Sequence, residues 1–115
     1  MKNNKYYELL NRLLDSTQEN RIGWSKTSRQ NEYSTDVGDY SITITSLSQS
    51  TFSLSKELNE KFALSLINID GEIVDLQILL PSDSDYNLIA DLYSQARFSY
   101  FKVDEVLDLL IEELK

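Results

Sequence analysis

Carboxylates are the side chains of this sequence whose spacing comes nearest to a catalytic pattern. Asp70, Asp75 and Gln77 lie on and beside one predicted hairpin. Carboxylates at a hairpin are a feature of metal-dependent nucleases, in which a lysine usually completes the set. Gln77 occupies the place that this lysine would take. A metal-dependent hydrolase that gathers Asp70, Asp75 and a distant base is therefore the weakest of our three functional hypotheses.

The other acidic groupings have simpler structural interpretations. Residues 70–72 (Asp-Gly-Glu) and 83–85 (Asp-Ser-Asp) lack the ligand spacing and closing glutamate of a calcium loop. Turn and helix-cap roles explain them better. Asp104 and Asp108 are one helical turn apart, but they belong to a predicted acidic solvent face. We predict no metal and no other cofactor.

Composition excludes most catalytic templates. The chain has no cysteine and no histidine, which removes thiolate nucleophiles, imidazole acid–base chemistry and the usual zinc sites. Its three glycines are far apart, so no glycine-rich phosphate loop occurs. Ser55 and Lys56 are adjacent in an expected exposed loop and would not form a desolvated base. We expect a protein that is not an enzyme.

Charge and length narrow the class of partner. A net charge of -8 over 115 residues argues against direct binding of nucleic acid, which requires a basic patch. The polar first residues and the lack of a long apolar run predict a single cytoplasmic domain with no membrane partner. Such acidity is typical of ordinary solubility, and it would also suit a protein that blocks a basic partner.

The alternation of apolar residues around an Asp-Gly pair predicts a hairpin between residues 62 and 80. A two-residue loop would set Leu66 opposite Asp75 and send the two apolar rows to opposite faces. We therefore predict a three-residue loop, 69–71, with its glycine left-handed, which pairs Leu66 with Val74. Between residues 33 and 44, Gly38-Asp39 predicts a second hairpin with a type II′ turn.

Three apolar stripes predict helices. The first helix spans about residues 4–19, is ended by Asn20 or Gly23, and is followed by Trp24 as a lid on the core. A second helix starts after a cap at Ser84 or Asp85, and a third starts near residue 103 after a corner, with Asp104 as its cap. Residues 25–31 read as a surface loop. Phe52 and Leu54 either form a short added strand or extend the second one.

These elements predict an α+β fold, a two-layer sandwich. Its four-stranded antiparallel meander carries one N-terminal and two C-terminal helices, all packed on one face. The other face is expected to be wet. If another protein binds, we expect it on that face, with the acidic side of the last helix as the alternative. The predicted partner-binding residues are Ser41, Thr43, Thr45, Ser65, Asp75 and Gln77.

Core and turn residues give the chain a loose resemblance to a group of bacterial proteins. The elements concerned are Ile22-Gly23-Trp24, the two hairpins, and Leu92 to Arg97 followed by Val103-Asp104-Glu105. Over nearly its whole length the chain resembles small uncharacterised bacterial α+β domain proteins. The resemblance implies a bacterial setting and no activity.

Two functional hypotheses from different classes are therefore carried forward. The first is a non-enzymatic protein-interaction module, monomeric or homodimeric, that binds another protein of unknown identity. The second is an acidic immunity or inhibitor protein that blocks a basic, nucleic-acid-directed enzyme or toxin. A separate expectation concerns Arg97, which follows Ala96 near Tyr93 and Tyr100 and should pair with a buried carboxylate or stack on a ring.

Overall fold

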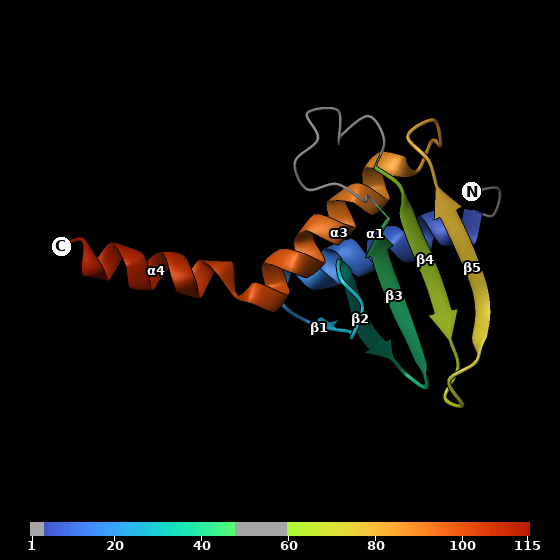
Figure 1. Ribbon diagram of the computed structural model, residues 1–115, viewed down its shortest axis with the longest axis horizontal. Helices are drawn as coiled ribbons and strands as arrows, with labels where there is room; N and C mark the ends of the chain where they lie inside the picture. Colours follow the sequence, from blue (N-terminus) through green and yellow to red (C-terminus); the bar gives the residue numbers. More distant parts are fainter. Residues whose placement is uncertain (1–3, 48–59) are drawn as a thin grey trace.

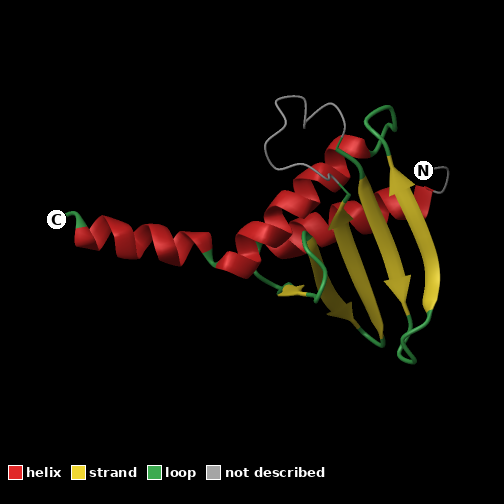
Figure 2. Ribbon diagram, in the orientation of Figure 1, coloured by secondary structure: helices red, strands yellow, loops and turns green. Residues whose placement is uncertain are grey.

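The computed structural model describes residues 4–47 and 60–115. These residues form an α+β fold with an antiparallel sheet in the order β1-β2-β3-β4-β5 (Figure 1; Figure 2). Along the chain the elements are α1 (Asn4–Gln18), β1 (Ser25–Lys26), β2 (Glu32–Val37), β3 (Tyr40–Ser46), β4 (Phe62–Ile67), β5 (Ile73–Leu79), α3 (Tyr86–Phe101) and α4 (Val103–Glu113).

The described sheet has five strands, so the prediction of four is wrong. The extra strand, β1, lies in the stretch that was expected to be a surface loop, and it pairs with β2 through Ser25 and Ser34. Both β1 residues are exposed, so the strand carries no apolar alternation by which it could be recognised. The predicted strand contribution of Phe52 and Leu54 lies outside the described residues.

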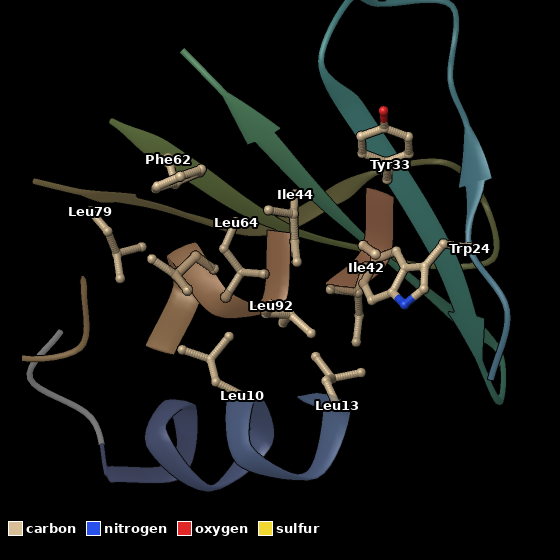
Figure 3. Close-up of a cluster of buried hydrophobic side chains, with 12 residues drawn as sticks. Leu10, Leu13, Trp24, Tyr33, Ile42, Ile44, Phe62, Leu64, Leu79 and Leu92 are labelled. Carbon is tan, nitrogen blue, oxygen red and sulfur yellow. The ribbon is translucent and has the colours of Figure 1, made fainter. Parts of the chain in front are cut away.

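Helices α1 and α3 pack against one face of the sheet and against each other. Leu10 and Leu13 point from α1 toward Ile42, Ile44 and Leu64 of the sheet (Figure 3). The fully buried members of the core come from α1, three strands and α3, which is the two-layer packing expected for this fold class. They include Leu10, Ile44, Phe62, Leu64, Leu79, Ile89 and Leu92.

The end of α1 is fixed by a left-handed residue. Asn20 has φ of 59°, and the Arg21 amide bonds the Ser16 carbonyl at 2.8 Å, as in a Schellman motif. The chain then turns back, and Trp24 becomes 94% buried, with its indole Nε1 donating to Thr17 Oγ1 at 2.9 Å. The predicted helix end at Asn20 and the buried position of Trp24 are both confirmed.

The β2–β3 hairpin has the predicted register. Val37 pairs with Tyr40 and Thr35 pairs with Ile42. Gly38 has φ of +62° and is the turn's left-handed residue. This position comes first in a type II′ turn and suits glycine, because a Cβ is unfavourable at positive φ.

The β4–β5 hairpin confirms the predicted loop but not the predicted ladder. Gly71 has φ of +82°, and the Asn68 amide bonds the Glu72 carbonyl at 2.9 Å, so residues 69–71 form the loop. Ile67 pairs with Ile73 as expected. The register then shifts, and Leu66 faces Asp75, so the predicted pairing of Leu66 with Val74 is wrong. Val74 is the extra residue of a β-bulge. After it, each side chain of β5 points to the face opposite the one predicted.

Helices α3 and α4 meet at the predicted corner. Lys102 separates them with φ of 53° and ψ of 49°, a left-handed conformation that interrupts the helical hydrogen bonds. The predicted side-chain caps are wrong: Asp85 is the N-cap residue of α3 without a side-chain cap bond, and Lys102 takes that position in α4 in place of Asp104.

The prediction that every helix packs on the sheet is wrong for α4. This helix extends away from the rest of the molecule (Figure 1), and it has no buried residue. From Val106 onward, its apolar residues are exposed to solvent.

Candidate interaction surface

The open face of the sheet, opposite α1 and α3, holds four of the six predicted binding residues. Ser41, Thr43, Thr45 and Ser65 alternate with core residues of β3 and β4, and Thr43 pairs with Ser65 across the ladder. These four residues therefore share one surface at the centre of the sheet.

Asp75 and Gln77 are placed wrongly by the sequence prediction. The bulge sets them opposite Leu66 and Leu64, on the face that α1 covers. The Tyr6 hydroxyl of α1 donates a hydrogen bond to Asp75, and Gln77 Nε2 donates to the same carboxylate oxygen at 3.0 Å. These two polar side chains therefore hold the β5 edge against α1 and are directed away from the open face.

The Tyr6–Asp75–Gln77 cluster has shifted pKa values. Burial, followed by the hydrogen bond to Asp75, raises the pKa of Tyr6 to about 12. The Tyr6 hydrogen bond, followed by that of Gln77, lowers the pKa of Asp75. At neutral pH the cluster is a neutral phenol that donates to a carboxylate. A general base would need a pKa close to the working pH, so this arrangement fits a structural role.

Side-chain bonds already use several hydroxyls of the open face. Ser41 donates to Asp36 at 2.7 Å, and Thr45 donates to Glu32 at 2.6 Å. Thr43 is 93% buried among its neighbours. Fewer hydroxyl groups of the open face are therefore available to hydrogen-bond a partner than the sequence suggested. The sequence predicts that replacing Thr43 and Thr45 together by lysine leaves the thermal melt nearly unchanged, and the burial of Thr43 argues against that prediction.

The apolar part of the open face was not anticipated. Beyond the bulge, Leu76 and Ile78 are on the open face, and together with Ile73 and Val74 at the bulge and Leu80 just after β5 they are 40–63% exposed. An apolar row of this kind on an edge strand is unusual, because native edges are commonly protected by charge or by a cover. We call this set the β5 row: Ile73, Val74, Leu76, Ile78 and Leu80.

A second apolar surface runs along α4. Its residues recur at helical spacing, and those from Val106 onward are 46–86% exposed. The opposite side of the helix carries the exposed carboxylates of Asp104, Glu105, Asp108, Glu112 and Glu113. We call the apolar set the α4 stripe: Val103, Val106, Leu107, Leu110, Ile111 and Leu114.

A hollow of about 580 Å³ lies where the α1–β1 connection meets the α3–α4 corner. Ile22, Phe98 and Val103 give it apolar walls, and Arg21 and Lys102 stand at its margin. On the same corner the Arg97 guanidinium lies 5.2 Å from the centre of the Phe101 ring, so the ring-stacking alternative for Arg97 is confirmed. The other titratable residues that line the hollow are Tyr100 and the acidic residues Asp104 and Glu105 at the start of α4.

Other kinds of site were sought in the part of the chain that the structure describes. Residues 4–47 and 60–115 contain no group of three acidic side chains placed to hold a metal ion. No described helix is both long enough and apolar enough to cross a bilayer. The β5 row and the α4 stripe are exposed apolar surfaces of the part of the chain that the structure describes.

The β5 row carries a signal that sequence analysis could have used. Its alternation is plain, from Val74 to Leu80, and the two-residue-loop register that was rejected gives the observed facing. That register was discarded because it left an apolar row uncovered. The exposed row could therefore have been predicted from the alternation of residues 74–80.

A scan of protein-family models, a search of curated proteins and a search of solved structures each returned no match.

Proposed function

We propose that this chain is a non-enzymatic protein-interaction module whose open sheet face is the docking surface. The observation that carries the proposal is the β5 row, because five apolar side chains in and just after an edge strand are 40–63% exposed. Burying half-exposed side chains of this size against a partner would stabilise a complex by roughly 1 kcal/mol each. The bacterial, cytoplasmic setting remains a prediction.

The edge position of β5 supports the same proposal. β5 is the last strand in the sheet order, so its outer backbone groups have no neighbouring strand among the described residues. A partner can therefore use apolar contacts on the face and backbone hydrogen bonds at the edge. The neighbouring hydroxyl residues Ser41, Thr45 and Ser65 would form the polar border of such an interface.

Affinity capture tests the proposal. The double variant Leu76→Lys/Ile78→Lys should keep its thermal melt within a few degrees of the wild type, because both side chains are about half exposed. It should lose the proteins that the wild type captures from an extract of its source cells. Val37→Lys/Tyr40→Lys is a matched control, since this cross-strand pair is also apolar and exposed but lies on the other face. Equal capture by both doubles would refute the open face as the docking surface.

A second candidate, an acidic inhibitor of a basic enzyme, is favoured by one observation. α4 projects five exposed carboxylates along one side, and a projecting acidic helix could enter a basic cleft and speed encounter. In this case capture should weaken steeply with added salt. Replacement of Asp108 and Glu112 by Asn and Gln should then abolish capture, whereas Leu76→Lys/Ile78→Lys should leave it unchanged.

A further inference from the structure

Two apolar surfaces of this chain have no cover in the described structure, and they are complementary in kind. The α4 stripe is the side of a helix that would normally pack on a sheet. The β5 row is the side of a sheet that would normally be covered by a helix. α1 and the opposite face of the same sheet already show this packing within one chain.

α4 does not reach its own β5 row in this structure. It leaves the molecule beyond β1 and β2, whereas β5 lies at the other edge of the sheet (Figure 1). A helix of 11 residues is marginally stable in water when it packs on nothing, since isolated helices below about 12–15 residues are marginal even with favourable sequences. Among the described residues, α4 therefore has no surface of its own chain on which its stripe packs.

We propose that a second copy of this chain supplies that surface. In the resulting two-fold dimer, the α4 stripe of each copy lies on the β5 row of the other. The inference rests on the proposed function, because it names the partner that docks on the open face. One chain provides one stripe and one row, so two copies satisfy all four surfaces and close the assembly.

The area available agrees with a stable dimer. Side chains at the observed exposures give the stripe and the row about 400–500 Å² of apolar surface each. Two reciprocal contacts would bury about 1,800 Å² in total, compared with roughly 1,600 Å² for a typical specific complex. One contact alone would fall below that size, which favours reciprocal exchange over a chain of single contacts.

Charge is compatible with the open sheet face as the surface for α4. The open-face positions of β3, β4 and β5, such as Thr43, Ser65 and Leu76, are uncharged. The carboxylates on the far side of α4 would therefore stay in water. Pairing the α4 stripes of two copies with each other would also leave the carboxylates in water, but it would leave both β5 rows uncovered.

Molar mass and point variants give the first test. The wild type should have twice the 13.3-kDa chain mass in light scattering after gel filtration. Leu110→Lys on the stripe and Leu76→Lys on the row should each yield monomer. Leu109→Lys is the matched control: Leu109 is 67% exposed but lies between Glu105 and Glu113 on the acidic side, so this variant should remain dimeric. A monomeric wild type at millimolar concentration would overturn the inference.

Engineered disulfides give the second test. Because the chain has no native cysteine, only the introduced cysteines can form a disulfide. Under mild oxidation, an equimolar mixture of the single variants Ile78→Cys and Leu110→Cys should form interchain disulfides, and each variant alone should form few. Cross-linking of Leu110→Cys with itself would show helix-to-helix pairing and overturn the exchange. Cross-linking of Ile78→Cys with itself would show sheet-to-sheet pairing and would also overturn it.

Failure of this inference can be told from failure of the proposed function. If the wild type is monomeric but a foreign protein is captured through Leu76 and Ile78, the docking face stands and the second copy is excluded. If Leu76→Lys/Ile78→Lys changes neither self-association nor capture, both are refuted.

Discussion

Helices α1 and α4 are both amphipathic, yet their environments differ completely. Leu10 of α1 has 0% of its surface exposed, whereas Leu110 of α4, at a comparable stripe position, has 54%. The difference lies in the connections. α1 is followed by a left-handed Asn20 and a buried Trp24 that return the chain to the sheet, whereas α4 follows a corner at Lys102 that directs it outward. An apolar stripe thus predicts that a helix has a cover but not which surface provides it.

Matched truncations on the two helices should show the largest contrast. Leu10→Ala removes a fully buried side chain and should lower the free energy of unfolding by about 2–5 kcal/mol. Leu110→Ala should cost less than about 1 kcal/mol in the monomeric Leu76→Lys background, where its stripe is exposed. Urea unfolding measures both. Equal losses in that background would show that α4 packs on its own chain.

The hydrogen bond between α1 and the returning chain should have the next largest effect. Thr17 Oγ1 accepts from the Trp24 indole and donates to the Leu13 carbonyl at 2.7 Å. Thr17→Val keeps the shape but leaves the buried indole N–H without its acceptor, so we expect a loss of about 1–3 kcal/mol. Urea unfolding measures this change too. Thr27→Val, in a part-buried loop, is the control and should cost less; a neutral Thr17→Val would mean that water replaces the bond.

The turn that precedes the β5 row offers a smaller effect. Gly71→Ala places a Cβ at φ of +82°, and although no atom lies within 4 Å of that Cβ, the backbone conformation itself is unfavourable for alanine. We expect a loss of about 1 kcal/mol in thermal or urea unfolding. Gly23→Ala meets an equally open space without positive φ and should be nearly neutral. Equal effects of the two variants would contradict a conformational cause.

The contact between α1 and β5 predicts the smallest, pH-dependent effect. The pKa of Tyr6 rises from 10.0 to about 12 on folding. Its stabilisation is therefore fully present below pH 10 and is lost as the pH rises through about 12. The pKa of Asp75 falls below its ordinary 3.8 on folding, so its stabilisation is present above that value and lost in stronger acid.

Thermal melts across pH can detect both contributions. Tyr93, whose pKa burial also raises to about 12, adds to the alkaline loss in every variant. Tyr6→Phe should therefore flatten the alkaline and acid limbs of the stability profile only in part. Tyr7→Phe, an exposed neighbour on α1, is the control and should reproduce the wild-type profile. Identical profiles for Tyr6→Phe and wild type would remove this contact from the stability of the fold.

Local patterns predicted the three helices and the two hairpin turns, because residues close together in the chain determine each of them. Gly38 determines the turn of the first hairpin, and Asn20 determines where α1 ends. The loop at Gly71 was also predicted correctly. The pairing of β4 with β5 beyond this loop was predicted wrongly. The residues of the turn do not indicate the bulge at Val74, and the rule that apolar rows are buried favoured the regular register.

The candidate surface was predicted only in part, for the same reason. Ser41, Thr43, Thr45 and Ser65 share the open face because β3 and β4 pair without interruption. Asp75 and Gln77 lie beyond the bulge, so the prediction assigned them to the wrong face. The exposed position of the α4 stripe depends on the direction of a corner, which residue spacing along a helix does not encode.

The left-handed backbone of Lys102 sets the angle between α3 and α4. If its backbone moved to right-handed values, α3 and α4 would merge into one rod over residues 86–113, roughly 42 Å long at about 1.5 Å per residue. Glycine at this position would favour the present bend, because it tolerates positive φ better than lysine does. Alanine would favour the rod. We therefore expect that a single substitution at Lys102 would change the direction of α4 without altering a residue of the α4 stripe.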